Sequence, residues 1–212
     1  GLQAFFMGAD FEYTDAIHGI TSSSALIGCI IGSAVSGFFA SGLGRKNSLF
    51  LAGILFFLSA LGSYYPEFLF FEHGVPSYSL LVAFNFYRVL GGIGVGLASA
   101  ICPMYIAEIA PSNIRGTLVS WNQFAIIFGQ LVVYFVNFLI LGSHANPVID
   151  LVNGVNQIMN PEAAAWTTET GWRLMFVSEA VPAGLFALLV LLVPETPRYL
   201  AMCGKDERAL NV

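Results

Sequence analysis

Long stretches without a charged side chain constrain this chain more than any other feature. No Lys, Arg, Asp or Glu occurs between Asp15 and Arg45, and a second uncharged run covers residues 47–66. About 20 apolar residues in a helix are enough to cross the hydrocarbon core of a bilayer. Since 57% of the residues are hydrophobic and only 10% are charged, the charges are too few to cover a water-soluble domain of this size. The sequence therefore predicts an all-α integral membrane protein.

Five segments of this kind follow one another along the chain. The predicted spans are about 19–41, 47–66, 78–102, 117–141 and 172–193, and residues 201–212 are predicted to begin a cytoplasmic helical segment. Small residues recur at every fourth position of the first segment, namely at Gly28, Gly32, Ser36, Ala40 and Gly44. Such a stripe lets the backbone of another helix approach closely in lipid.

Lys and Arg alternate with the loops between these spans. They are missing after the second and fourth spans and occur after the first, third and fifth, as Arg45, Lys46, Arg115, Arg198, Lys205 and Arg208. Because basic residues are retained on the cytoplasmic side, we expect a multi-pass protein of the cell membrane with its N-terminal end outside and its C-terminal end in the cytoplasm. Arg173, at the outer edge of the fifth span, is the exception. An odd number of spans starting outside is typical of a chain that lacks its first helix, so we expect this chain to be part of a longer protein.

Two charged residues lie inside predicted spans, Arg88 in the third and Glu179 in the fifth. A charge at the centre of a bilayer costs about 3 kcal/mol on insertion scales, so such residues usually face the protein interior and find a partner. The functional interpretation is a charge pair near a transport path that responds to a proton. The alternative is a static salt bridge between two helices.

Amide side chains recur along the fourth span with a spacing of seven residues, at Gln123, Gln130 and Asn137. This spacing places all three on one helix face, and Tyr134 falls on the same face. Amides both donate and accept hydrogen bonds, which suits a neutral ligand rich in hydroxyl groups. The alternative is hydrogen bonding between helices, which polar residues in membranes also perform.

Charges of both signs gather at the predicted inner ends of the spans. They are Arg45, Lys46, Glu108, Arg115, Glu195 and Arg198. Ion pairs among them would hold the cytoplasmic side shut. The basic members are also explained by topology alone, whereas the two glutamates are not, which favours pairing.

Patterns of enzymes and metal sites do not fit. The glycines at 91–96 depart from G-x-G-x-x-G, because Leu97 occupies the last position counted from Gly92. The three histidines are isolated, and Cys29, Cys102 and Cys203 have no metal-ligand or disulfide spacing. The few basic residues are too scattered for a nucleic-acid surface. We therefore expect no enzyme, no catalytic residue, no metal site, no cofactor and no nucleic-acid partner.

Several motifs resemble, in the same order, those of the sugar porters of the major facilitator superfamily. Residues 194–200 read P-E-T-P-R-Y-L and resemble the motif that follows the sixth helix of that family. Residues 87–96 resemble its fourth helix, and residues 108–116 resemble its loop between helices four and five. Residues 122–131 are similar to the fifth helix of the family's bacterial xylose–proton symporters. The resemblance covers about residues 21–200 and implies that residues 1–200 are helices two to six of an N-terminal six-helix bundle.

The resemblance also assigns roles to individual residues. Gln123 and Gln130 match the sugar-binding glutamines of the family, and Ile126 lies in the same wall. Arg88 and Glu179 match the partners of a proton-linked aspartate on the first helix. The cytoplasmic ion-pair network of the family corresponds to Arg45, Glu108, Arg115, Glu195 and Arg198. One departure is the loop at 41–46, where the aspartate and the first arginine of the family's D-R-x-G-R-R/K motif are absent.

The function implied by the resemblance is sugar transport by alternating access, with proton-coupled symport of a pentose or hexose such as D-xylose. The alternatives are a facilitative sugar uniporter and a non-transporting sugar sensor of the same fold. The implied partners are the sugar, a proton, the lipid bilayer and a C-terminal half of the same protein.

Overall fold

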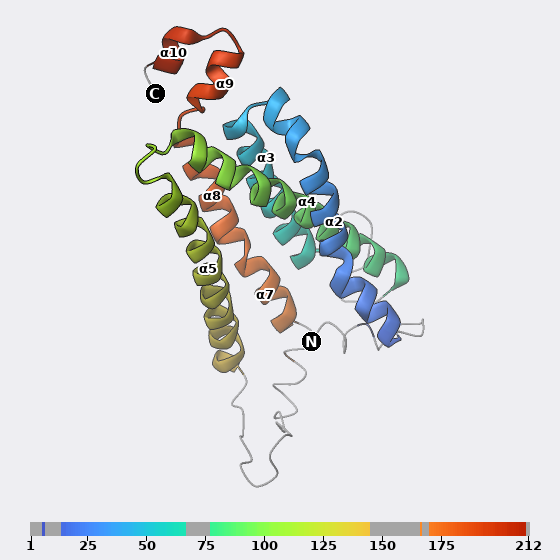
Figure 1. The fold of residues 1–212 in the computed structure, drawn as a ribbon. Coiled ribbons are helices and arrows are strands. Elements are labelled where there is room, and N and C mark those ends of the chain that lie inside the picture. The colour runs from blue at the N-terminus through green and yellow to red at the C-terminus, as the bar shows by residue number, and fades with distance from the viewer. Residues whose placement is uncertain (1–5, 7–13, 67–76, 145–165, 167–169, 211–212) are drawn as a thin grey trace.

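The computed structural model describes residues 6, 14–66, 77–144, 166 and 170–210, and this part of the chain is helical without a strand (Figure 1). Its helices are α2 (Asp15–Gly42), α3 (Arg45–Tyr64), α4 (Tyr78–Ile109), α5 (Arg115–His144), α7 (Trp172–Ser178), α8 (Ala180–Leu192), α9 (Pro197–Met202) and α10 (Asp206–Leu210). Five spans are long and apolar enough to cross a membrane, with α7 and α8 together forming the fifth. The predicted class, an all-α integral membrane protein, is confirmed.

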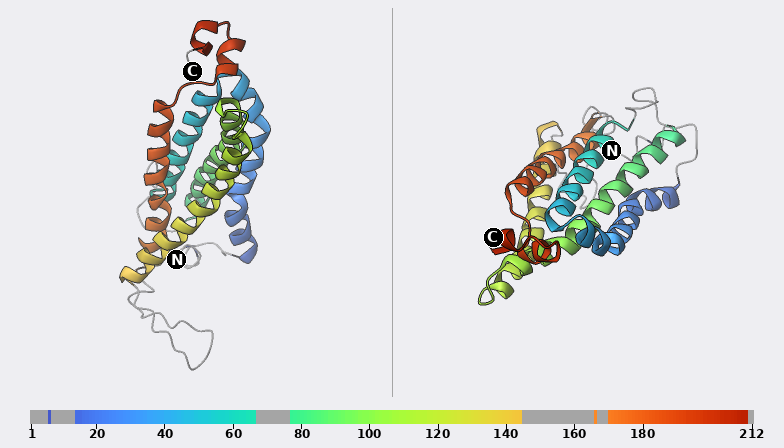
Figure 2. Two further views of the ribbon diagram at one scale, coloured as in Figure 1. Left: turned by 60° about the vertical axis from the view of Figure 1, so that its left-hand side comes forward. Right: turned by 90° about the horizontal axis from the view of Figure 1, so that it is seen from above.

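The spans lie side by side as a bundle, with α5 at one edge (Figures 1 and 2). The turn from α2 to α3, the link from α4 to α5 and the short helices α9 and α10 lie at the same end, at the top of Figure 1. We call this the inner end, and the opposite one the outer end. Helices continue past the predicted spans, and α4 for example ends at Ile109 rather than at 102.

Glycines let α2 and α4 pack backbone to backbone. A Cβ atom added at Gly28 or Gly32 would overlap the carbonyl oxygen of Val89 or Ile93 on α4. A Cβ at Gly92 would in turn overlap the carbonyl oxygen of Ala25 on α2. The stripe of small residues therefore brings the two helices together, as its spacing predicts.

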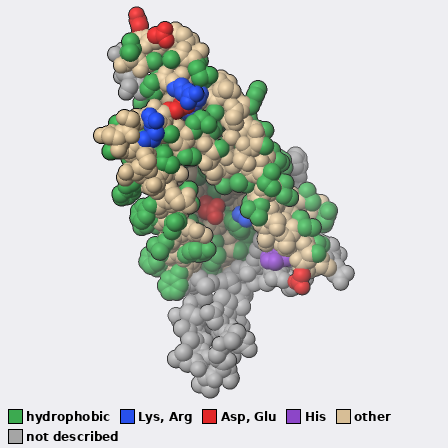
Figure 3. Space-filling model, viewed as in Figure 1, with side chains coloured by type: hydrophobic (Ala, Val, Ile, Leu, Met, Phe, Trp, Pro, Cys, Tyr) green, Lys and Arg blue, Asp and Glu red, His purple; other side chains and the backbone are tan. Residues whose placement is uncertain are grey.

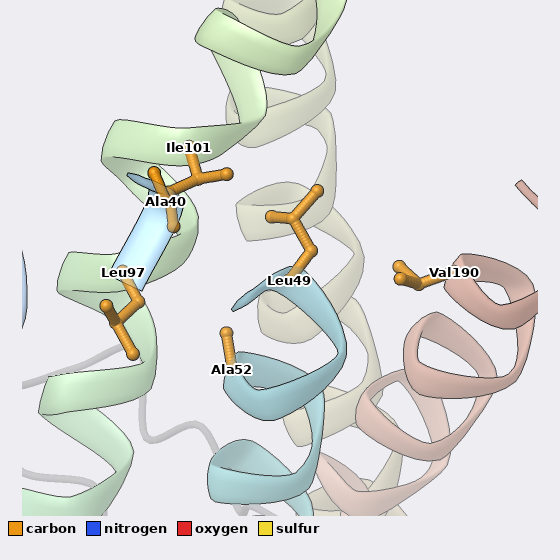
Figure 4. Close-up of a cluster of buried hydrophobic side chains, with 6 residues drawn as sticks. All are labelled: Ala40, Leu49, Ala52, Leu97, Ile101 and Val190. Atoms are coloured by element: carbon orange, nitrogen blue, oxygen red, sulfur yellow. The ribbon is translucent and has the colours of Figure 1, made fainter. Parts of the chain in front are cut away.

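Two clusters of buried apolar side chains hold the bundle at different depths. One lies toward the inner end and joins four helices through Ala40, Leu49, Ala52, Leu97, Ile101 and Val190 (Figure 4). The other joins α4 and α7 with Phe6, through Leu80, Leu81, Phe84 and Trp172. These clusters fix α2, α3, α4 and the α7–α8 span as one packed unit.

The fifth span has one irregular turn between α7 and α8, at Glu179, whose dihedral angles (φ −69°, ψ −20°) remain in the helical region. Pro182 has no N–H to donate to the carbonyl of Ser178, and its ring crowds that carbonyl, so a regular helix is interrupted there. The backbone N–H of Glu179 instead reaches the carbonyl of Phe176 at 3.3 Å. The irregular turn places a carboxylate at the middle of a span.

Helix α5 is the least covered of the spans. None of its described side chains is buried, and it contacts mainly α4 and α7. Most of its apolar side chains therefore face away from the rest of the described chain.

Candidate functional site

A cavity of about 380 Å³ opens inside the bundle between α2, α3, α4 and α8. Its wall consists mainly of small and apolar side chains, and its polar members are Ser59, Arg88, Cys102 and Glu179. Figure 3 shows a hollow on this face of the molecule with acidic and basic side chains inside it. The structure thus brings the two charges from separate predicted spans to one cavity.

Arg88 and Glu179 share this cavity without forming an ion pair with each other, although both side chains lie in the described part of the chain. The guanidinium carbon of Arg88 lies 5.2 Å from the ring centroid of Phe176 on α7. An arginine over an aromatic face gains a modest attraction that does not use up its hydrogen-bond donors. The geometry differs from a closed static salt bridge and leaves both charged groups facing the cavity.

The amide face of α5 lies apart from that cavity. Gln123, Gln130 and Ile126 are exposed, and none of them is among the described cavity-lining residues. The Nε2 atom of Gln130 lies 3.5 Å from the hydroxyl of Tyr134, a long contact within the same helix. The Oδ1 atom of Asn137 is buried without a hydrogen-bond partner among the described residues. The predicted sugar contacts therefore point to space that the described chain does not fill.

An ion pair between Arg45 and Glu108 lies at the inner end. The Nη2 atom of Arg45 is 2.9 Å from Oε1 of Glu108, and the two side chains are only 8% and 7% exposed. Nη1 of Arg45 also donates to the carbonyl of Ala40 at 3.2 Å. The contact uses a single oxygen, so Nε of Arg45 and Oε2 of Glu108 are buried without partners among the described residues. This is the one ion pair that the structure shows among the six inner residues singled out from the sequence.

Glu195 binds backbone groups instead of a cationic side chain. Its Oε1 atom accepts the backbone N–H groups of Arg45 and Lys46, both at 3.1 Å. These are the first two N–H groups of α3, which have no partner inside the helix. A carboxylate there satisfies them and complements the positive end of the helix dipole.

Gly44 makes this approach possible. Its φ of 92° lies in the left-handed region that favours glycine. A Cβ atom at this position would also overlap the Oε2 atom of Glu195 and lie 2.8 Å from the Tyr199 ring. Glycine at the start of α3 therefore leaves room for the carboxylate.

The other inner residues have separate contacts. Lys46 donates from Nζ to the carbonyl of Leu191 at 2.8 Å, near the end of α8. Nη2 of Arg115 lies 3.5 Å from the carbonyl of Ala110 in the link before its own helix. Arg198 is exposed on α9. The sequence predicted one network, and the structure gives one ion pair and several contacts to helix ends.

Two tyrosines that the sequence analysis did not single out also join the inner helices. Tyr105 donates its hydroxyl to the carbonyl of Pro194 at 2.7 Å, and Tyr199 donates to the carbonyl of Gly42 at 3.1 Å. A hydrogen bond with the Cys203 side chain is the main reason that the pKa of Tyr199 lies above its usual range. The place of Tyr199 in the P-E-T-P-R-Y-L motif was the clue available in the sequence.

Comparison with known proteins gives consistent matches over nearly the whole chain. The profile of the family described as "Sugar (and other) transporter" matches residues 3–212. The chain is 47% identical over 204 residues to the D-xylose-proton symporter of Escherichia coli (strain K12), which covers 93% of this chain and 38% of that protein. It is 32% identical over 197 residues to the glucose facilitated diffusion protein of Zymomonas mobilis, which covers 93% of this chain and 37% of that protein.

A solved structure agrees with these matches. The partially occluded inward open conformation of the xylose transporter XylE from E. coli superimposes with a TM-score of 0.82 at 44% identity. The superposition covers 98% of this chain and 46% of that chain. This chain thus spans less than half the length of the proteins it resembles.

Proposed function

Because this chain belongs to the sugar transporter family of the major facilitator superfamily, we propose that it is part of a protein that carries a sugar across the cell membrane by alternating access. The observation that carries the proposal is a packed half-bundle with two charges in a central cavity and an uncovered amide face on α5. In this mechanism, two helical bundles rock about a site near the middle of the membrane. The described helices would form most of one bundle, and a C-terminal half of the same protein would form the other.

The proposed substrate is a pentose or hexose such as D-xylose, bound through the amides of Gln123 and Gln130 with Ile126 beside them. A sugar hydroxyl can donate to an amide oxygen and accept from an amide nitrogen. The exposure of all three residues supports this role, because they are available to a ligand held between the two halves.

Replacing Gln130 by alanine in the full-length protein is expected to weaken D-xylose binding about 10- to 100-fold, since one or two hydrogen bonds are lost at a site that excludes water. Isothermal titration calorimetry on the purified protein measures this change. Ser120→Ala is the matched control on the same helix, because the Ser120 hydroxyl donates to the carbonyl of Gly116 in its own helix. Equal affinities of Gln130→Ala and Ser120→Ala would contradict the proposed sugar site.

Proton-coupled symport is the proposed mode of energy coupling. It is supported by Arg88 and Glu179, which line one cavity without pairing to each other and so leave a carboxylate that can change its protonation state. The similarity to a protein named D-xylose-proton symporter supports the same mode. The similarity to a glucose facilitated diffusion protein favours the alternative, a facilitative uniporter.

Adding D-xylose to energy-depleted cells in an unbuffered medium separates these two modes. A symporter makes the medium more alkaline as protons enter with the sugar, whereas a uniporter leaves the pH unchanged. Arg88→Gln is expected to abolish this alkalinisation while sugar counterflow continues, because the charge that faces Glu179 is gone. Wild-type uptake without a pH change would favour the uniporter. Binding without any vesicle flux would instead favour a sugar sensor.

The inner residues are proposed to form a cytoplasmic gate. The Arg45–Glu108 pair is its centre in this structure, and the proposed gate also includes Lys46, Arg115, Glu195 and Arg198 at the same end of the bundle. The buried Oε2 atom of Glu108 has no partner among the described residues, so it is free to accept a further hydrogen bond when the two halves close. In this arrangement the N-terminal end of the chain lies outside, and α9 and α10 lie in the cytoplasm.

A further inference from the structure

Each end of α3 is held by a charged side chain from the neighbouring α7–α8 span or the residues just after it. At the inner end, the carboxylate of Glu195 accepts the backbone N–H groups of Arg45 and Lys46. At the outer end, Nη1 of Arg173 donates to the carbonyl of Tyr64, the last residue of α3, at 3.2 Å. An anion at the N-terminus and a cation at the C-terminus of a helix both complement its dipole.

Arg173 is buried, and a buried cation needs acceptors such as the carbonyl of Tyr64. Arg173 is 5% exposed, and its guanidinium carbon lies 4.8 Å from the ring centroid of Trp172. A buried cation is costly unless acceptors surround it, and the end carbonyls of a helix are such acceptors. This explains why a basic residue occurs at the outer end against the usual distribution of Lys and Arg.

The span that carries Arg173 has an irregular turn at Glu179, whereas α3 is a continuous helix of 20 residues. Between the two segments, the N–H of Glu179 reaches the carbonyl of Phe176 at 3.3 Å, and its carbonyl accepts the N–H of Ala183 at 3.1 Å. Both α7 and α8 pack against α3. Contacts with α3 therefore help to set the position of both segments, together with the packing of α7 against α4.

We propose that Arg173 and Glu195 are positioning residues, which tie the two ends of the α7–α8 span to opposite ends of α3 and so hold Glu179 in the cavity beside Arg88. Lys46 strengthens the inner attachment, because it donates to the carbonyl of Leu191 while Glu195 binds the N–H of Lys46. The role of Glu195 within the proposed gate is then to cap α3, because its partners in the structure are backbone N–H groups and not a cationic side chain.

The consequence for transport rests on the proposed function, in which Glu179 responds to protons. The charged or titratable groups that line the cavity with Glu179 are Arg88 and Cys102, both on α4. The described lining residues of α2, α3 and α8 add no further titratable group. A shift of Glu179 relative to Arg88 is therefore expected to change how transport depends on pH.

The first test uses the full-length protein in lipid vesicles with D-xylose, as wild type and as Arg173→Gln, Arg173→Lys and Arg208→Gln. Arg173→Gln is expected to move the pH of half-maximal uptake by about half a unit or more, because the charge environment of Glu179 changes. Arg173→Lys keeps a cation that can donate to Tyr64 and is expected to keep the wild-type profile. Arg208→Gln is the matched control, since Arg208 is exposed on α10. An unchanged pH profile of Arg173→Gln, with or without a lower unfolding temperature, would overturn the positioning role.

The second test measures the register of the two helices without any sugar. A Cβ atom at Gly184 on α8 would lie 3.7 Å from the ring of Phe57 on α3, so Phe57→Cys with Gly184→Cys should be joined by a short bifunctional thiol reagent. The background carries Ser in place of Cys29, Cys102 and Cys203.

Glu195→Ala removes the cap and is expected to lower this cross-linking yield about twofold or more, whereas Glu195→Gln keeps an acceptor oxygen for Arg45 and Lys46 and should preserve it. Equal yields in the Glu195→Ala protein and its parent would refute the capping role. If Glu195→Gln lowered the yield as much as Glu195→Ala does, the carboxylate charge and not the cap would be responsible, which also overturns the proposal. If the cross-linking yields follow this expectation but the protein takes up no xylose, the proposed function is rejected while the capping role stands.

Discussion

Replacing Gly32 by valine in the full-length protein is expected to prevent the bundle from assembling. A Cβ atom at this position would overlap the backbone carbonyl oxygen of Ile93 and lie 2.9 Å from its Cα atom. Backbone atoms of a packed helix cannot move aside as a flexible side chain does, so α2 and α4 would have to separate. Overpacking of a core costs about 1–3 kcal/mol when side chains can adjust, and we expect a larger loss here. Size-exclusion chromatography of the detergent-extracted protein should show aggregate in place of a single symmetric peak.

Gly37→Val is the matched control for this experiment. Gly37 lies on the same helix, and a Cβ atom there would meet no atom of the described chain within 4 Å. Both substitutions introduce the same β-branched side chain into α2, so their intrinsic helix propensities change equally. Similar peaks and unfolding temperatures for the two variants would show that α2 and α4 do not approach as the structure describes.

Removal of Glu108 is expected to cause the second large loss. Arg45 is 7% exposed, and Glu108→Ala removes the carboxylate that pairs with its guanidinium group. Breaking a buried ion pair from one side typically costs about 3–5 kcal/mol, because an uncompensated charge remains in a poorly solvated place. The unfolding temperature of the purified full-length protein should fall well below that of Arg208→Ala, which removes an exposed charge at the same end of the molecule.

The double variant Arg45→Met with Glu108→Leu distinguishes the two contributions to this effect. Replacing a buried pair by apolar side chains of similar volume is often neutral or stabilising, so the double variant should recover most of the lost stability. Transport should stay impaired, because the proposed gate has lost its central pair. A double variant as unstable as Glu108→Ala would mean that packing, and not the unpaired charge, determines the loss.

The fold was largely predictable because a bilayer restricts the options for a chain. Uncharged segments of sufficient length must be helices there, and the stripe at Gly28 and Gly32 indicates which face of α2 packs closely. The irregular turn at Glu179 was not predicted, although Pro182 three residues later is a local cause. Helix α4 continues to Ile109, beyond the span predicted at about 78–102, because a helix can extend past the hydrocarbon core.

The sequence predicted which residues belong to the candidate site better than it predicted their contacts. Arg88 and Glu179 stood out because a charge inside a span is rare, and the structure places both at one cavity. Glu195 was grouped with ion-pair residues, whereas its partners are N–H groups of Arg45 and Lys46, about 150 positions away in the chain. A sequence does not show which backbone N–H groups lack a partner, so residue spacing does not reveal a cap supplied by a distant link such as the one between α8 and α9.

The position of α5 at the edge of the bundle separates the amide row from the charges in the cavity. Within the described residues, α5 meets the packed unit mainly through α4 and α7, and its glutamines share no wall with Glu179. Thermodynamic linkage requires that sugar and proton each alter the affinity for the other by the same factor. In the proposed symporter, in which these two groups share no described contact, we therefore expect the reciprocal effect to arise from the global state that each ligand favours.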